Sequence, residues 1–477
     1  MGAFLAANPP RGAGGSREAP GLLPGTSGGY GMRKLLLGST AVAAAALFAP
    51  SGAMAQGVSF SDSSMGAAGT SMRGLEVRLG GYYRAMYNYT NQTGDNNATT
   101  RLGKSDFTNE IEIHILASGK AANGLQYGVA LEIENDAYRQ PQAGNPATNS
   151  VSNSGKNTLA FDEAWAYLAG PWGQIRYGDE DGAIQQLQSG HITGFGVGGL
   201  DSGDQYQQAI GGNQRAQFNT VNDPGDNTKL IYLSPQFLGF DAGASFSFNT
   251  NDGANSGCDT IANAAFCDRT SAIAGVNTRR RNELQAALRW RGSFGPVGLT
   301  ATVGYFGANA IRNTTGISPQ SINLIWAGAA ATAYGFTVGG WYTGGQGNGG
   351  FNTYVPDRGG IGNRRDDRSL NSFLIGATYT IDAITVGGHF ARSVSAGAQD
   401  IATGARRETG FAVGGNYRVA PGLDFFAEYI QTQRKEAGFN FLTGTGSTSA
   451  ASGGANTTVQ TVGSTVGTVL AGFRVAF

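Results

Sequence analysis

The sequence is poor in the side chains on which most enzyme and metal chemistry depends. Its 477 residues include three histidines, His114, His191 and His389, and two cysteines. It has no GxSxG, HExxH or phosphate-loop motif. Alternation places His114 on the same strand face as Glu112, but no further catalytic partner follows from the sequence. We therefore predict that the protein is not an enzyme and has neither a cofactor nor a metal centre.

Long apolar runs and a surplus of one charge are also missing. The mean hydropathy is −0.20, and no run of about 18 uncharged apolar residues occurs beyond residue 55, which excludes a helical membrane protein. The chain has 33 basic and 33 acidic residues; without the four basic and one acidic residues of the first 55, it carries a net charge of −3. This balance gives no support to nucleic-acid binding.

Glycine, tyrosine and small polar residues are abundant instead. The 77 glycines and 18 tyrosines, with many Asn, Ser and Thr residues, fit short strands joined by polar loops. A disordered secreted chain is the alternative on composition. The regular recurrence of aromatic residues inside alternating segments argues against it.

The N-terminal region is predicted to contain a targeting sequence that is cleaved from the mature protein. Met32, Arg33 and Lys34 precede the apolar stretch LLLGSTAVAAAALFAP, and residues 53–55 (Ala-Met-Ala) form a small-x-small cleavage pattern. We expect a signal peptide over residues 32–55; a membrane anchor is the alternative, but no basic flank follows. Residues 1–31 are expected to be an unstructured leader, or to result from a start codon assigned too far upstream. Residues 56–73 would form a short periplasmic segment.

The two cysteines, Cys258 and Cys267, lie close together in a polar segment. In an exported chain, such a pair is expected to form a local disulfide bond. A metal site is the alternative, but no histidine lies near them.

Period-two alternation of apolar and polar residues begins at Gly74. In FTNEIEIHIL, the side chains of Ile111, Ile113 and Ile115 share one face, opposite those of Glu112 and His114. A soluble sandwich can show the same alternation, so the number of strands and the loop lengths must decide. Sixteen such segments occur, at residues 74–90, 105–119, 124–138, 160–169, 173–178, 228–235, 239–250, 281–292, 298–308, 320–333, 335–344, 369–380, 383–394, 408–419, 423–434 and 464–477.

The connections between these segments alternate between short turns and long polar links. Short turns such as KAANG and VAPG contrast with links such as residues 179–227 and 435–463. An even strand number with long loops at one rim predicts an all-β, 16-stranded antiparallel transmembrane β-barrel over residues 74–477. The chain ends in the alternating strand VLAGFRVAF, which would pair with the first strand and place Phe477 at the periplasmic edge.

Aromatic residues near predicted strand ends suit the girdles at the two membrane interfaces. Plain packing is the alternative for each residue taken singly, so only the whole set indicates girdles; it includes Trp172, Trp290, Trp326 and Trp341.

Two segments resemble the general porins of Gram-negative bacteria. They are FDEAWAYLAGPWGQIRYGDEDGA, at residues 161–183, and DNTKLIYLSPQFLGFDAGASF, at residues 226–246. The resemblance implies a homotrimer of 16-stranded barrels in the outer membrane. It also implies an inward-folded third loop, here residues 179–227, that narrows the barrel opposite a basic wall.

The candidate constriction residues follow from this resemblance and from strand parity. The acidic candidates in the loop are Asp179, Glu180, Asp181, Asp201 and Asp204. The basic candidates with inward parity are Arg78, Arg84, Arg289, Arg291, Arg418 and Arg474. Opposed carboxylates and guanidinium groups set up a transverse field in a narrow aqueous pore. The alternatives are a solvated outer loop for the acidic residues and lipopolysaccharide contacts for the basic ones.

The sequence therefore predicts a water-filled porin for passive diffusion of small hydrophilic solutes and ions. A substrate-selective channel, or a surface adhesin that uses its long loops, is the alternative. Expected partners are outer-membrane lipid and lipopolysaccharide, further copies of the chain, the diffusing solutes, and the barrel assembly machinery, which by the resemblance reads Phe477.

Overall fold

The structure is a computed structural model that describes residues 75–96, 103–136, 160–201, 216, 218, 227–249, 280–310, 321–346, 370–395, 405–447 and 457–477. The predicted leader, signal peptide and periplasmic segment lie outside the described residues, as do Asp204, Cys258 and Cys267.

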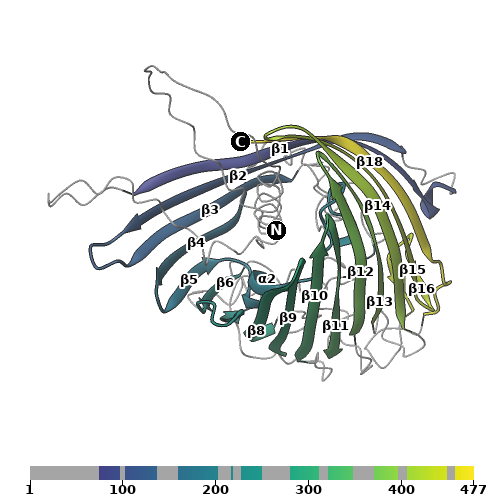
Figure 1. The fold of residues 1–477 in the computed structure, drawn as a ribbon. Helices are drawn as coiled ribbons and strands as arrows, with labels where there is room; N and C mark the ends of the chain where they lie inside the picture. Colours follow the sequence, from purple (N-terminus) through teal and green to yellow (C-terminus); the bar gives the residue numbers. More distant parts are fainter. Residues whose placement is uncertain are drawn as a thin grey trace, which may run out of the picture.

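In the described part of the chain, sixteen antiparallel strands close into a barrel (Figure 1). Each corresponds to one predicted segment, with ends that differ by no more than two residues. The strands are β1 (Glu76–Gln92), β2 (Ser105–Lys120), β3 (Gln126–Asp136), β4 (Ala160–Gly170), β5 (Gly173–Asp179), β6 (Thr228–Leu233), β7 (Phe240–Asn249), β8 (Arg280–Phe294), β9 (Val297–Ala310), β10 (Ile322–Ala333), β11 (Phe336–Gln346), β12 (Leu370–Ile381), β13 (Ile384–Ser395), β14 (Arg406–Ala420), β15 (Leu423–Lys435) and β18 (Ser464–Ala476).

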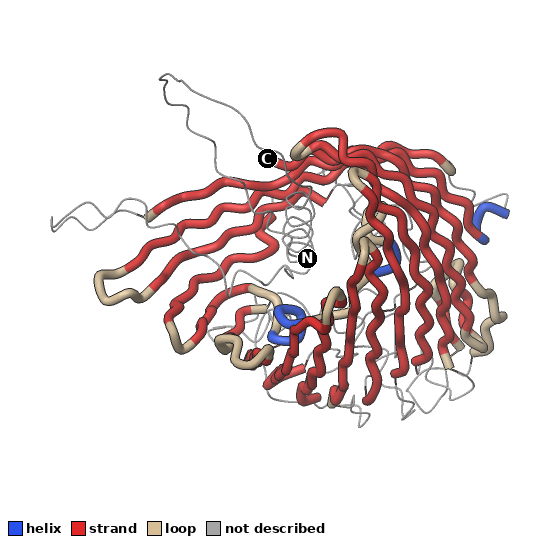
Figure 2. The backbone as a smooth tube through the Cα atoms, in the orientation of Figure 1, coloured by secondary structure: helices blue, strands red, loops and turns tan. Residues whose placement is uncertain are grey.

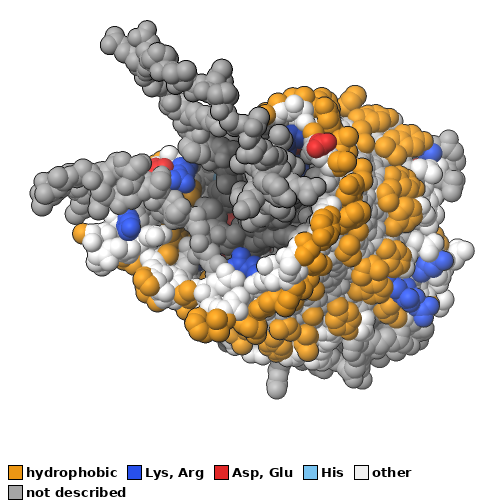
Figure 3. Space-filling view, in the orientation of Figure 1, with side chains coloured by type: hydrophobic (Ala, Val, Ile, Leu, Met, Phe, Trp, Pro, Cys, Tyr) orange, Lys and Arg blue, Asp and Glu red, His pale blue; other side chains and the backbone are white. Residues whose placement is uncertain are grey.

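Alternation of side chains determines which residues face the lumen. On β7, Ser245 and Ser247 are buried on the inner side, while Phe246 and Phe248 are exposed on the outer side. The same pattern repeats around the barrel, so hydrophobic side chains cover much of its outer face (Figure 3). This apolar exterior suits a hydrocarbon environment rather than water.

The last strand closes the barrel by pairing with the first, as predicted. The register of β1 and β18 places Tyr82 opposite Ala476 and Arg84 opposite Arg474. Beyond this ladder, Gly81 N–H donates to Phe477 O (3.2 Å) and Phe477 N–H donates to Gly81 O (3.1 Å). The terminal residue is therefore tied into the sheet by its backbone, while its side chain is exposed.

Short connections join the strands at one rim. In the turn between β10 and β11, Tyr334 and Gly335 both have positive φ, 52° and 83°. Since Ala333 pairs with Phe336, this is a two-residue hairpin, and positive φ at both positions matches the twist of the strands it joins.

Small elements occupy the longer links. They are the 3₁₀ turns η2 (Thr93–Asn96) and η4 (Gly199–Asp201), the helix α2 (Ala183–Leu187), and a hairpin of β16 (Phe439–Asn440) and β17 (Thr445–Gly446). Within the described ranges, no helix is both long enough and apolar enough to cross a membrane.

Candidate functional site

The chain that follows β5 folds into the barrel instead of leaving it. We call residues 180–201 the loop segment. Its helix α2 contacts β6, β7, β8 and β9, and its end, η4, contacts β13, β14 and β15. Figure 2 shows α2 on the inner side of the strands, across the opening from β1 and β2. The inward fold of the third loop is therefore confirmed for the part of it that the structure describes.

Apolar side chains attach the loop segment to the wall. Ile184, Leu187, Ile192, Phe195 and Leu200 are all buried. They belong to one cluster with inward-facing side chains of the strands beneath, among them Ile231, Phe306, Leu324, Trp326, Trp341, Leu374 and Ile430. Full burial of one such side chain contributes about 1.5–3 kcal/mol. The inner wall from β6 to β15 is thus partly apolar, and the loop segment covers it.

Trp326 and Trp341 correct one part of the sequence interpretation. Both belong to the set that suited the interface girdles, with plain packing as the alternative for each residue, and both are buried on the inner side in the cluster beneath the loop segment. An apolar residue under an inward-folded loop gives the same sequence signal as one that faces lipid. Trp172, by contrast, is exposed beside a short turn, as a girdle residue should be.

Asp201 forms a latch at the end of the loop segment. Its carboxylate accepts hydrogen bonds from Trp341 Nε1, 3.0 Å from each oxygen, and its Oδ2 lies 2.7 Å from His191 Nδ1. His191 stacks on Trp326 with a centroid distance of 5.8 Å. Burial alone would raise the pKa of Asp201, but the neighbouring imidazoles and these hydrogen bonds outweigh it, so the pKa is lowered.

Wall residues also bind the backbone of the loop segment directly. His389 Nδ1 lies 2.9 Å from Ile192 O, and its Nε2 accepts from Leu200 N–H at 2.8 Å, which requires the tautomer with hydrogen on Nδ1. Glu428 accepts a 2.8 Å hydrogen bond from Val197 N–H. These side chains of β13 and β15 supply hydrogen-bond partners for backbone groups of the loop segment, which would otherwise be buried without a partner.

The start of the loop segment is fixed by an ion pair. Arg176, on the inner side of β5, donates to Glu180 at 2.8 Å and to Gln186 at 3.0 Å. Burial raises the pKa of Glu180, against the opposing effect of the Arg176 guanidinium. Lys229 Nζ donates to Glu180 O at 2.8 Å. Glu180 is therefore an anchor of the loop segment as well as one of its charges.

The other acidic candidates lie in different environments. Asp179 ends β5 on the side shared by Ile175 and Tyr177, the outer side, and accepts a 2.5 Å hydrogen bond from Thr228. Asp181 is half-buried next to Glu180.

Two basic candidates come together on the wall where the barrel closes. Arg84 and Arg474 are register partners on β1 and β18, and both guanidinium groups lie over the ring of Tyr82, at 4.9 and 4.3 Å. Arg84 also donates to Glu110 at 2.6 Å. Arg84 interacts electrostatically with Glu428, which binds the loop segment, so this basic pair lies near the end of the loop segment.

The remaining basic candidates divide into two groups. Arg289 and Arg291 share Asp241, at 2.5 and 3.0 Å, near the turn-side end of β7 and β8. Arg78 and Arg418 are exposed near short turns and pair with Glu76 and Asp424. The structure therefore brings Arg84 and Arg474 together and places Arg78 and Arg418 at the rim.

Sequence reasoning missed several residues of this site. Arg176 could have been found, because Gln174 and Arg176 alternate with the apolar Ile175 and Tyr177. No local sequence pattern marks the other residues as part of the site, because their contacts join segments that are distant in sequence. They are His191, His389, Trp341 and Glu428.

Comparisons with known proteins agree with this geometry. A family model described as "Gram-negative porin" matches residues 40–438, most of the chain. The chain belongs to the Gram-negative porin family. As a porin it lies in the outer membrane and forms a channel for passive diffusion, which confirms the predicted location and function. Family membership also indicates a channel rather than an enzyme.

A solved structure shows the same fold at low sequence identity. A porin structure refined at 1.8 Å resolution matches with 16% identity and a TM-score of 0.50, and covers 84% of this chain and 100% of its own. A mutant of Rh. blastica porin has the same identity and coverage and a TM-score of 0.46. Among proteins with curated descriptions, none matches the sequence significantly.

Proposed function

We propose that solutes cross this porin between the loop segment and a charged wall on β1, β2, β3 and β18. The charged wall comprises the inward side chains Arg84, Glu110, Glu112, His114, Glu132 and Arg474. The observation that carries the proposal is the attachment of the loop segment. Its described elements contact the wall on β6 to β9 and on β13 to β15, so the charged wall lies on the side of the barrel to which α2 and η4 are not attached.

The charge of this wall favours a general channel with weak ion preference. Three carboxylates lie among two guanidinium groups and one imidazole, so neither sign dominates. Charged groups of both signs in a narrow aqueous passage orient polar solutes without binding one of them tightly. Small hydrophilic solutes and ions are therefore the proposed cargo.

Reversal potentials in planar bilayers under a KCl gradient test this passage. The double variant Arg84→Gln/Arg474→Gln should shift the preference toward cations, because it removes two positive charges beside the path. The matched control is Arg418→Gln, which removes a positive charge that is exposed at the rim. A shift of equal size in the control, or none in the double variant, would contradict the proposed path.

We also propose contacts with lipopolysaccharide phosphates and with further copies of the chain. Arg392, Arg407 and Lys435 are exposed on the outer side of β13, β14 and β15, near their loop-side ends, and Arg407 is the register partner of Lys435. Guanidinium and ammonium groups at this rim suit phosphate binding. A homotrimer is supported by the resemblance described above, and mass measurement of the unheated protein in detergent tests it.

Finally, we propose that the barrel assembly machinery reads Phe477. Its ring is exposed on the outer side, and its backbone hydrogen bonds to Gly81 do not depend on the side chain. The side chain of Phe477 can therefore serve recognition while its backbone takes part in barrel closure.

A further inference from the structure

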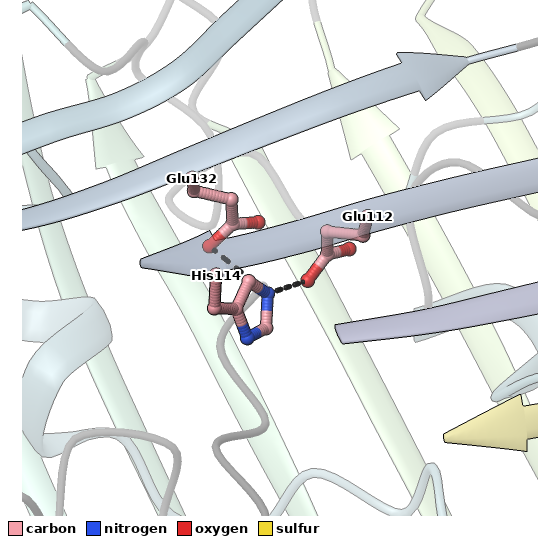
Figure 4. Close-up of side chains that lie close together, drawn as sticks. All are labelled: Glu112, His114 and Glu132. Carbon is pink, nitrogen blue, oxygen red and sulfur yellow. Dashed lines mark hydrogen bonds and ion pairs between the residues drawn. The ribbon is translucent and has the colours of Figure 1, made fainter. Parts of the chain in front are cut away.

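Three potential metal ligands converge on the charged wall. Glu112 and His114 lie two residues apart on the inner face of β2, and Glu132 is the register partner of His114 on β3. Figure 4 shows the three side chains turned toward one another. One ligand atom from each residue can be chosen so that all three lie within 4.8 Å of one another. The cluster lies about halfway along both strands.

The contacts within the cluster leave two carboxylates to share one imidazole. His114 Nε2 contacts Glu112 Oε1 and lies 3.7 Å from Glu132 Oε2. Carboxylates held this close repel each other when both are charged. A cation between them would remove that repulsion, and a single imidazolium can do so only in part.

Neighbouring residues orient the cluster, and the guanidinium groups of Arg84 and Arg474 interact electrostatically with Glu112. The Tyr82 hydroxyl lies 2.5 Å from Glu112 Oε2 and 2.5 Å from Glu110 Oε1, and it has one hydrogen to donate. The nearby guanidinium of Arg84 donates to Glu110. Hydrogen bonds of this kind to a ligand carboxylate are typical of the shell that surrounds protein metal sites.

We propose that Glu112, His114 and Glu132 bind a divalent transition-metal ion, for which Zn²⁺ is the best match. Zn²⁺ combines imidazole nitrogen and carboxylate oxygen as ligands, whereas Mg²⁺ and Ca²⁺ prefer oxygen alone. Three protein ligands would leave a fourth position for water from the lumen. The atoms of neighbouring ligands around one zinc ion lie roughly 3.4 Å apart, so His114 and Glu132 are already near that spacing.

The proposed ion would change the channel. It would bring two positive charges to the charged wall and shift the ion preference of the pore away from cations. A porin that holds Zn²⁺ at this site would respond to the metal content of its surroundings.

Calorimetric titration of the purified porin in detergent with ZnCl₂ tests the site, with MgCl₂ as the comparison metal. We expect saturable Zn²⁺ binding that is weaker by at least about 10-fold in His114→Asn and in Glu132→Gln, and weak Mg²⁺ binding. The control Glu134→Gln removes one charge from the same strand without removing a ligand and should bind Zn²⁺ as the wild type does. Far-UV circular dichroism shows that each variant is folded, and either ligand variant suffices if the other does not fold.

Several outcomes would overturn the proposal. These are the absence of Zn²⁺ binding, equal binding of Mg²⁺, wild-type affinity in His114→Asn, or an equal loss in Glu134→Gln, which would mean diffuse attraction to negative charge. In planar bilayers, Zn²⁺ should shift the reversal potential of the wild type toward anions. The same shift in His114→Asn would also contradict the site.

Discussion

At the scale of single residues, Asp201 links the loop segment directly to the wall through its carboxylate. The residue was nominated as a charge at the constriction, but its carboxylate is buried against Trp341 and His191. Its role in the structure is therefore to hold the end of the loop segment. Glu180 has a comparable role at the start, through Arg176.

The lowered pKa of Asp201 predicts an acid-sensitive latch. The stabilisation is fully present above about pH 3.9, the pKa of unfolded aspartate, and is lost as the pH falls through the lower pKa of the folded state. Trp326 and Trp341 lie beneath the loop segment, so tryptophan fluorescence should report its release. In Asp201→Asn this transition should be absent, and the loop segment should be about 1.5–3 kcal/mol less stable at neutral pH.

Glu180→Gln is the matched control for this experiment. Burial raises the pKa of Glu180, so its charged form is disfavoured in the folded protein and acidification does not remove stability through it. The acid transition should therefore persist in Glu180→Gln. A transition that survives in Asp201→Asn and disappears in Glu180→Gln would show that Asp201 is not the acid-sensitive latch.

Strand parity predicted the direction of most charged side chains, because a lipid-facing guanidinium at mid-membrane costs about 2–4 kcal/mol. It predicted Arg84 and Arg474 on the inner side, and both are there. Parity could not predict height along the barrel, so Arg78 and Arg418 were grouped with residues far from the rim. Nor could it identify partners such as His389, which are defined only by where the loop segment lies.

At the scale of elements, close approach between the loop segment and the wall requires glycine. A Cβ added to Gly328 on β10 would lie 1.9 Å from Ser189 O, and one added to Gly190 would lie 2.1 Å from Gly340 O. At Gly194, in the same loop segment, the nearest atom would be 3.9 Å away. The wall and the loop segment are therefore in contact at backbone level near β10 and β11.

Gly328→Ala should push the loop segment away from the wall. Overpacking of this kind costs about 1–3 kcal/mol, and the displaced backbone would enter the lumen. We expect a lower single-channel conductance and altered tryptophan fluorescence. Gly194→Ala should leave both unchanged; equal effects in the two variants would mean that the contact at Gly328 does not position the loop segment.

The terminal strand allows closure and recognition to be separated. Phe477→Ala should lower the amount of porin in the outer membrane several-fold, yet the purified variant should refold in detergent as the wild type does, because its backbone hydrogen bonds remain. Phe473→Ala, also on the outer side of β18, is the control. A refolding defect in Phe477→Ala, with normal membrane levels, would assign Phe477 to closure instead.

The strands themselves were predictable from the sequence, with ends that differ by no more than two residues. Alternation and turn residues act locally, so a single sequence contains their signal. The path of the loop segment was not predictable in the same way. Its helix has five residues, and its position depends on apolar contacts with strands as distant as β15.

At the scale of the whole molecule, the two sides of the interior differ in what covers them. The loop segment covers the side from β6 to β15, which carries apolar residues and ion pairs such as Arg434 with Glu408; the other side, on β1, β2, β3 and β18, carries the charged wall beside apolar residues such as Met86 and Leu470. Sequence alternation alone predicts a uniformly polar lumen. The inward-facing apolar residues beneath the loop segment could therefore not be distinguished from residues that face lipid or lie in the girdles. Trp326 and Trp341 can face inward because the loop segment covers them there.

The central claim is that the loop segment narrows an aqueous channel in this porin. Single-channel conductance in planar bilayers tests it most directly, with the wild type compared with a variant in which residues 183–200 are replaced by a short glycine-serine linker and whose barrel is verified by circular dichroism. We predict steady, ohmic conductance steps for the wild type and clearly larger steps for the variant. An absence of steps in the wild type, or the same step size in both proteins, would contradict the claim.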